Sequence, residues 1–478
     1  FEIAARYFAD CTGDGRLGAE AGADFRMGRE ARAEYGERHA PEVADRKTLG
    51  STILYMARRH ARPMPFTAPE WARQFDEGDL RLRSHREFEY GYWWMEWGGE
   101  LDTIRDNDRI RHELLRIALG VWDHVKNHCQ DFADTNAATY DKWLEGAAPA
   151  EERSVANWAL EWIGMLPGKR ESRRFLGPYV LREGDVLEGH LPEDEVAYGG
   201  WWIDMHPPAG VDAVAEFPCE QVEVPHLYGI PLRSLYSRNI ENLFFAGRNI
   251  SATHVAFAST RVMGTCATVG QAVGTAAAYA CRTGIHTAAA LASEPHIQAI
   301  QQMLLRDDAF LPGIRNEDPE DLARFARIQA SSEQPDAPAG ALTDGVTRAT
   351  SARMHPTLAD AAHQWRSVGL PAWVELVWPR PQRIRSVQLI FDTGFERELT
   401  LTMSDLYNRR MIHGPQPETV ADYALSTPDG WTEAVTGNYQ RRRVHEFREP
   451  LITDRLRVTV TRTHGDPCAR IFEIRSYS

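Results

Sequence analysis

The sequence contains no C-x-x-C pair, because its six cysteines are scattered singly over 478 residues. Zinc ribbons, zinc fingers and thioredoxin-like redox sites use closely spaced cysteines, so this spacing gives those site types no support and we predict no metal site. The cysteines are also too sparse for the disulfide framework of a small secreted domain. No G-x-S-x-G string is present, so nothing favours a serine hydrolase.

Positive charge is in short supply. The chain has 54 Lys and Arg against 68 Asp and Glu, a formal net charge of −14. An acidic chain is a poor partner for nucleic acid or an anionic membrane, so we expect neither. The longest run with almost no charge includes Gln271, several threonines and several glycines. We therefore expect a packed helix there and no transmembrane segment.

The remaining composition is that of a globular protein. Hydrophobic residues make up 43% and aromatic residues 10%, which is ample for folded cores and excludes wholesale disorder. A chain of 478 residues is too long for one compact core, so we expect two or three domains. The cysteine usage leaves the cellular compartment open.

One stretch, residues 242–282, organises the rest of the sequence. A short apolar run from Leu243 ends at Gly247, as a strand would, and a polar loop leads to a long segment of small residues. Such a smooth helix can approach a strand or a flat ligand closely, and its first turn offers free N–H groups. The pattern predicts a socket for a large anionic or electron-rich cofactor, although an ordinary packing helix has the same pattern. The small residues at helical spacing are Gly264, Ala267, Gly270, Gly274 and Ala278.

A second stretch lies at the beginning of the chain. Residues 3–9 have the pattern of a strand, and residues 10–15 that of a turn, with an Asx-type turn as the simplest reading. Gly13, Gly15 and Gly18 match G-x-G-x-x-G. We do not interpret them as a dinucleotide fingerprint, because polar residues precede Gly13 and the segment after it is a poor crossover helix.

Both stretches resemble one family. Asn-Leu-Phe-Phe-Ala-Gly-Arg followed by Ser-Ala-Thr-His, and Asp-Cys-Thr-Gly-Asp-Gly, are similar to strings of the bacterial FAD-dependent oxidoreductases, within the glutathione-reductase superfamily. The wider superfamily usually has Gly-Asp where this chain has Gly247-Arg248. The resemblance implies FAD as cofactor, with these contacting residues: Asp10, Thr12, Gly13, Asp14, Gly15, Gly247, Arg248, Gly264, Thr265 and Cys266.

The resemblance also carries an expectation about the start of the chain. In that family a true G-x-G-x-x-G near the N-terminus binds the FAD pyrophosphate. No strand–loop–helix unit of this kind precedes residue 10. We therefore expect the given sequence to lack the first part of the family's FAD domain.

The fold class we predict is an α/β FAD-binding domain, present in part, with an α+β cap or substrate domain, followed by an all-β jelly-roll sandwich. Apolar residues from Ile110 to Val125 recur at three- and four-residue steps, which predicts a helix, and residues 154–163 are a second amphipathic helix candidate. Alternation such as Val374, Leu376 and Trp378 predicts the sandwich, which resembles discoidin and galactose-binding-like domains.

The expected divisions follow from these patterns. Residues 331–341 are polar and Pro-rich, so we expect a linker there with few contacts across it. Residues 1–40 would then end the first FAD-binding segment, 41–232 form the cap, 233–330 return to the FAD domain, and 342–478 form the sandwich.

Two histidines are the candidates for catalysis. A flavin enzyme that oxidises an alcohol needs a base for the hydroxyl proton, and histidine suits that task near neutral pH. His254 lies in the loop before the cofactor-facing helix, and His206 follows Asp204 at a spacing that puts both side chains on one side of a strand. Arg248 and Arg261 flank the same loop.

The function expected is therefore an FAD-dependent oxidoreductase that oxidises a hydroxyl of a sugar, polyol or related metabolite. The expected partner is a small-molecule substrate, with a carbohydrate suggested only by the appended sandwich. The alternative is a non-catalytic glycan-binding protein that carries a degenerate flavoprotein scaffold.

Overall fold

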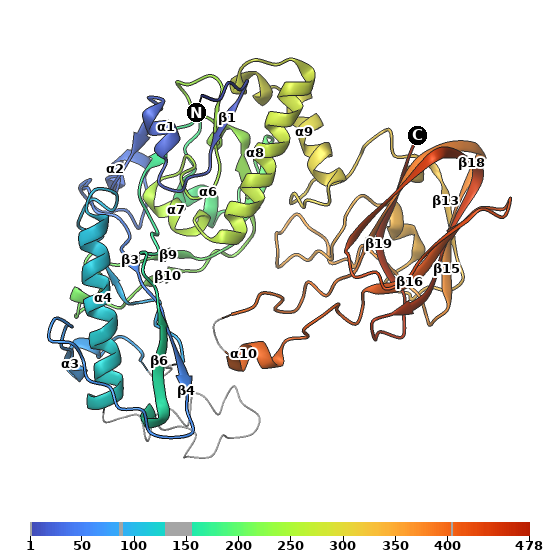
Figure 1. Cartoon of the computed structure of the whole chain (residues 1–478). Coiled ribbons are helices and arrows are strands. Elements are labelled where there is room, and N and C mark those ends of the chain that lie inside the picture. Colours follow the sequence, from blue (N-terminus) through green and yellow to red (C-terminus); the bar gives the residue numbers. More distant parts are fainter. Residues whose placement is uncertain (1, 86–88, 130–154, 403–404) are drawn as a thin grey trace.

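The computed structural model describes residues 2–85, 89–129, 155–402 and 405–478. It has three parts, which Figure 1 shows. A compact part holds the first strand and the yellow-green helices, a long cap hangs from it along a single helix, and a β-sandwich lies to one side. Among the described residues, no helix combines the length and apolar character needed to cross a membrane.

The compact part joins the two ends of the predicted FAD-binding region. Strand β1 (Phe8–Asp10) pairs in parallel with β12 (Leu243–Phe245), so segments more than 230 residues apart lie side by side. The polar loop follows β12 as predicted and leads into α7 (His254–Thr260) and α8 (Met263–Thr283). Phe244 and Phe245 are fully buried, which explains why this short strand anchors the core.

Short elements complete the compact part. Two antiparallel pairs, β2 with β7 and β8 with β11, flank the parallel pair. Helix α9 packs on α8. The bounds are α1 (Arg16–Glu20), β2 (Phe25–Arg26), α2 (Arg32–Tyr35), β7 (Arg174–Phe175), α6 (Glu183–Leu187), β8 (Glu195–Gly199), β11 (Tyr228–Pro231) and α9 (Glu294–Arg306).

The cap is built along α4 (Asn107–Asp123), whose apolar face from Ile110 to Val121 is buried as the periodicity predicts. A π-helix (His124–His128) continues it. The helix expected for 154–163 is instead a strand, β6 (Trp158–Ile163), paired with β4 (Tyr55–Arg59), and residue 154 lies outside the described residues. Pairing with β4 outweighs the amphipathic helical pattern, because the Trp and Ile residues of β6 also favour a strand. The other cap elements are β3 (Ser51–Thr52), α3 (Glu77–Leu80), β5 (Glu96–Trp97), β9 (Ile203–Met205) and β10 (Glu220–Val222).

The C-terminal part is an antiparallel sandwich, in agreement with the all-β prediction. Its strands follow the order β14-β19-β15-β18-β16-β17, and β13 pairs with β15. The predicted inward residues Val374, Leu376 and Trp378 are all buried in its core. The bounds are β13 (Arg327–Ala330), β14 (Trp365–Arg366), β15 (Ala372–Phe391), α10 (Asp405–Arg410), β16 (Val420–Ser426), β17 (Thr432–Val435), β18 (Arg442–Thr463) and β19 (Arg470–Tyr477).

The segment expected to be a linker belongs to the sandwich in the structure. Strand β13 lies before it and pairs with β15, while the Ser331 amide donates to the Trp373 carbonyl at 2.9 Å. Ala339, inside the expected linker, and Leu342 are buried in the sandwich core. The Pro-rich composition therefore marks turns that fold onto the sheet, rather than a free tether.

Close contacts also join the sandwich to the compact part. The guanidinium of Arg441 lies 2.7 Å from a carboxylate oxygen of Asp308, and that of Arg348 lies 4.5 Å from the centroid of the Phe310 ring. A ring nitrogen of His355 lies 2.9 Å from the Gly189 carbonyl oxygen. Arg475 of the sandwich also donates a hydrogen bond to the Leu305 carbonyl of α9. These contacts differ from the expectation of few contacts across a linker.

Candidate functional site

The turn at residues 10–15 is organised by a buried carboxylate. One oxygen of Asp10 accepts hydrogen bonds from the Thr12 amide at 2.9 Å and the Thr12 hydroxyl at 2.7 Å. The other oxygen accepts from the Gly18 amide at 2.7 Å. Gly13 and Gly15 have φ of 76° and 66°, in the left-handed region that favours glycine. Asp10 and Thr12 thus shape the turn, and α1, only five residues long, is no crossover helix.

Arg248 connects this turn to the second predicted FAD-binding segment. Its guanidinium lies 2.8 Å from one oxygen of Asp14, and the Lys169 ammonium lies 2.6 Å from the other. A Cβ placed on Gly13 would stand 2.1 Å from an Arg248 nitrogen, so the arginine crosses the turn where only glycine leaves room. Asn249 adds a hydrogen bond to the Asp10 carbonyl at 3.3 Å. The structure therefore brings these two segments together.

The start of α8 is the third predicted cofactor contact, and it is open. Val262 caps the helix without a side-chain hydrogen bond, and the Met263 side chain is 88% exposed. Gly264 has nothing within 4 Å of the place where a Cβ would stand. Thr265 is buried, and burial raises the pKa of the half-buried Cys266 thiol. No hydrogen bond among the described residues joins these residues to the 10–15 turn.

His254 lies at the first position of α7 within a buried charge cluster. Its Nδ1 is 3.1 Å and 3.0 Å from the two oxygens of Glu171, and its amide donates to Glu30 at 2.9 Å. Arg174 lies 2.5 Å from Glu171 and 2.7 Å from Glu30. Thr253 caps the helix by accepting from the Ala256 amide. Burial alone would raise the pKa of Glu171, but its interactions with His254 and Arg174 outweigh burial and hold the pKa below its ordinary value.

The hydrogen bonds of His254 fix which ring nitrogen is available. A carboxylate can only accept, so the Nδ1 facing Glu171 carries the proton. Nε2 then holds the lone pair, and within the described residues no group donates to it. A histidine held by a carboxylate on one nitrogen and available on the other is the arrangement that general bases use.

His206 lies in a second cluster, made mostly by the cap. Its Nδ1 is 2.9 Å from Glu96, its Nε2 is 3.0 Å from Asp204, and the Arg261 guanidinium lies 3.1 Å from the same Nε2. The Asp204–His206 pair predicted from the two-residue spacing is therefore present. Arg170 lies 2.6 Å from Glu96 and completes the cluster.

The charges of this cluster balance one another. Burial alone would raise the pKa of Asp204, but the hydrogen bond and charge of His206, with the charge of Arg261, hold it well below its usual range. Burial lowers the pKa of Arg261, and the neighbouring Arg170 adds to this. Burial and the Asp204 charge raise the pKa of Cys219 to about 12, so this thiol stays protonated. Each ring nitrogen of His206 lies within 3.0 Å of a carboxylate oxygen, in contrast to His254.

Three tryptophans lie close to the His206 cluster. The Trp93 ring meets the His206 ring edge-on, with centroids 5.5 Å apart. The Ser259 hydroxyl of α7 donates to the Trp201 carbonyl at 2.5 Å, and Trp202 comes directly before β9. All three side chains are exposed although they are large and apolar. Exposed tryptophans of this kind can stack on the flat apolar face of a ligand.

Helix α7 separates the two histidines. His254 is its first residue, and Arg261, which contacts His206, directly follows its last residue. Seven helical residues span about 10 Å. Each histidine therefore has its own set of carboxylates, and the prediction that both border one cavity remains a prediction.

The residues present fit an FAD molecule. The Nε of Arg248 is buried and has no hydrogen-bond partner among the described residues, next to the glycines of the 10–15 turn. The uncapped start of α8, with its exposed glycine, offers N–H groups to an electron-rich ring edge. Arg248, the 10–15 turn and the α8 start would hold the cofactor.

Sequence reasoning missed the carboxylates that hold the two histidines. Glu171 and Arg174 belong to a charge run that, by the usual rule, would lie on a solvated surface, yet both are buried. Glu96 was hidden in an aromatic cluster.

Comparison with known proteins decides the family. The model of the family described as "FAD dependent oxidoreductase" matches residues 1–304, well over half of the 478 residues. The chain belongs to this family. The prediction of FAD as the cofactor is confirmed, since the family is FAD dependent. No curated protein matches the chain.

Solved structures of carbohydrate-binding modules are similar to about a third of the chain. The chain is similar to the family 32 carbohydrate-binding module from C. perfringens NanJ in complex with galactose, at 14% identity and a TM-score of 0.23, covering 33% of this chain and 96% of that one. It is also similar to the family 32 module from Streptococcus pneumoniae EndoD, at 14% identity and a TM-score of 0.24, covering 33% and 99%.

Proposed function

We propose that this FAD-dependent oxidoreductase oxidises a hydroxyl group of a sugar, polyol or related metabolite, and that His254 is the base. This proposal depends most on the His254–Glu171 pair, which leaves Nε2 of His254 available to accept a proton. FAD, when bound, supplies the acceptor for the hydride. The hydroxyl proton passes to Nε2 as the hydride leaves the carbinol carbon, so the alcohol becomes a carbonyl.

Glu171 has a defined part in this reaction. It holds the imidazole in the tautomer that has its proton on Nδ1, and its negative charge stabilises the imidazolium formed when Nε2 takes the substrate proton. Arg174 keeps Glu171 ionised, because its buried guanidinium lies 2.5 Å away. The network is thus arranged so that His254, and not Glu171, gains the proton.

The His206 cluster is proposed to bind the substrate. Asp204 and Arg261, which are partly exposed, offer a hydrogen-bond acceptor and a donor of fixed orientation, which suits a ligand with several hydroxyl groups. The exposed rings of Trp93 and Trp202 offer flat apolar surfaces beside them. Polar groups next to an aromatic face favour a carbohydrate-like substrate over a purely apolar one.

The test is anaerobic reduction of the bound flavin. The holoenzyme is mixed with a panel of aldoses, polyols and cyclitols, and loss of the oxidised flavin absorbance is followed. At least one hydroxylated compound should reduce the flavin, while its deoxy analogue at the reacting position should not. A protein that binds FAD but is reduced by none of the panel would overturn the substrate class. One that cannot be reconstituted with FAD would favour a glycan-binding protein.

A further inference from the structure

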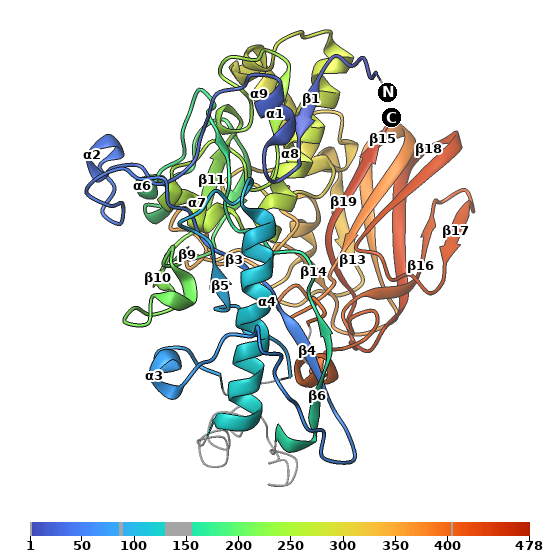
Figure 2. The same ribbon diagram turned by 60° about the vertical axis from the view of Figure 1, so that its left-hand side comes forward.

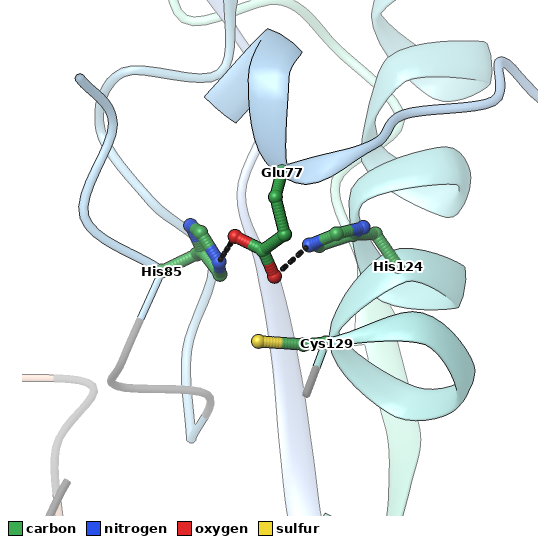
Figure 3. A group of neighbouring side chains, drawn as sticks. All are labelled: Glu77, His85, His124 and Cys129. Atoms are coloured by element: carbon green, nitrogen blue, oxygen red, sulfur yellow. Dashed lines mark hydrogen bonds and ion pairs between the residues drawn. The ribbon is translucent and has the colours of Figure 1, made fainter. Parts of the chain in front are cut away.

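The foot of the cap carries a cluster of metal-ligand residues that lies outside the two histidine clusters described above. Glu77, His85, His124 and Cys129 each offer one ligand atom, and these atoms all lie within 4.8 Å of one another. In Figures 1 and 2, α3 and the end of α4 lie at the opposite end of the molecule from α8. Figure 3 shows the four side chains converging from three segments.

We propose that this cluster is a structural zinc site. Zinc is bound in proteins by the sulfur of Cys, the nitrogen of His and the oxygen of Asp or Glu, most often with four ligands in a tetrahedron. Zinc bonds are about 2.0–2.2 Å long to nitrogen and oxygen and about 2.3 Å long to sulfur. In a tetrahedron, such bonds place neighbouring ligand atoms about 3.4–3.7 Å apart. The Glu77 carboxylate lies 3.6 Å from Nε2 of His85 and 3.1 Å from Nε2 of His124, close to that spacing.

Both histidines are oriented as metal ligands. Nδ1 of His85 lies 2.8 Å from the Arg83 carbonyl, and Nδ1 of His124 lies 3.0 Å from the Phe75 carbonyl. A carbonyl only accepts, so each Nδ1 carries a proton, and each Nε2 turns its lone pair toward the carboxylate. Two lone pairs facing one carboxylate need a cation between them, which is the arrangement of zinc-bound histidines.

The charge balance favours a metal over two extra protons. The His124 side chain is only 1% exposed, and a charged imidazolium at that depth is costly. A zinc ion with two neutral histidines, a carboxylate and a thiolate has no net charge. The Cys129 sulfur, which points into the same space in Figure 3, supplies the second negative ligand.

Local structure explains why these residues meet. Glu77 is the first residue of α3, whose start is fixed by reciprocal hydrogen bonds between Asp76 and Asp79. The Cys129 amide donates to the His124 carbonyl at 2.8 Å, closing a π-helical turn. This turn is wider than an α-helical one, so position i+5 returns toward the face of position i. Spacing in the sequence predicted no metal site, because the ligands come from three segments.

The proposed role is to tie the foot of the cap together. Zinc would join α3, the segment at His85 and the end of α4, which already meet at the Glu77 carboxylate. With all four positions taken by protein, the site is closed, as structural zinc sites are. Binding energy at such a site adds directly to folding stability.

Metal content and a cobalt spectrum test the proposal in the untagged full chain. Purified protein should hold about one zinc ion per chain. Cobalt exchanged into the site should show the strong visible bands of tetrahedral coordination and a near-ultraviolet thiolate-to-cobalt band. Cys129→Ser should abolish the thiolate band. Matched controls are Cys281→Ser, on the exposed face of α8, and His112→Ala, exposed on α4, which should leave both measurements unchanged.

A second variant guards against simple misfolding. Glu77→Gln changes a side chain that is 47% exposed, so the fold should survive, yet cobalt should bind about tenfold or more weakly. A chelator should lower the melting temperature of the wild type and leave that of Cys129→Ser unchanged. Wild type that takes up neither zinc nor cobalt after metal is added back would overturn the proposal. A thiolate band that persists in Cys129→Ser would do the same.

Discussion

The two histidine clusters contain the same kinds of residue but differ in how many partners each ring has. His254 has one carboxylate, at Nδ1, and its Nε2 accepts from no described group. His206 has a carboxylate at each nitrogen and Arg261 beside one of them. A base needs an available lone pair, whereas a ring with a charged group beside each nitrogen is held as a polar surface. The comparison assigns proton transfer to His254 and substrate binding to His206.

The largest expected effect is on the rate of flavin reduction, which should differ between alanine variants of the two histidines. Removing a positioned base costs about a hundredfold to ten-thousandfold, so His254→Ala should reduce its bound flavin that much more slowly with substrate. His206→Ala should mainly raise the substrate concentration needed for half-maximal rate. Anaerobic stopped-flow absorbance measures both, with bound FAD as the control for folding. Equal losses of limiting rate in the two variants would break the comparison.

The next effect concerns stability. Glu171→Ala removes the partner of His254 and Arg174 in a fully buried network, which should cost about 3 kcal/mol in the free energy of unfolding. Asp204→Asn should cost only about 1 kcal/mol, because Asp204 and Arg261 are partly exposed and the amide can still accept a hydrogen bond. Denaturant unfolding measures both changes. A larger loss for Asp204→Asn would mean that the His206 cluster is the structural one.

Glu195 is a second buried carboxylate, and its pKa can be compared with that of Glu171. Burial raises its pKa to about 9, and no cation among the described residues offsets this, whereas Glu171 beside His254 and Arg174 has a lowered pKa. Because folding raises the pKa of Glu195, the folded state binds its proton more tightly, and stability is lost as pH rises toward 9. Between about pH 7 and pH 8 the loss should be about 1.4 kcal/mol.

Glu195→Gln should flatten this slope. The exposed neighbour Glu193→Gln is the matched control and should leave the slope as in the wild type. Denaturant unfolding at several pH values measures it. A slope of opposite sign in the wild type, or one unchanged in Glu195→Gln, would show that Glu195 is ionised in the fold.

The smallest expected effect on stability concerns Gly264, at the start of α8, where FAD is proposed to bind. Gly264 has open space around it at the start of α8, so Gly264→Leu should not destabilise the cofactor-free protein and should gain up to about 1 kcal/mol of helix propensity. The added side chain should nevertheless obstruct FAD and weaken its binding. Ala278→Leu, exposed near the far end of the helix, is the control. Flavin fluorescence titration measures binding, and unaltered affinity in Gly264→Leu would place the flavin elsewhere.

The sequence predicted elements whose pattern is local. The strand at Leu243, the turn at Gly247 and the helices after it, the buried face of α4, and the Asp204–His206 pair each depend on spacing within a few residues. The buried charges depend on tertiary partners: Glu171 and Arg174 are buried because His254 and Glu30 meet them from distant segments. The cluster around Glu77 and the packing of residues 331–341 on the sandwich also depend on partners from distant segments, so local spacing did not predict them.

Chemical rescue tests the central assignment most directly. His254→Ala leaves a space beside Glu171 that can hold free imidazole, and the rate of anaerobic flavin reduction by substrate is measured with and without it. Imidazole should restore the rate of flavin reduction in His254→Ala and should have no effect on the rate in His206→Ala, with FAD bound in both variants. Rescue of His206→Ala alone, or a wild-type rate in His254→Ala without imidazole, would contradict it.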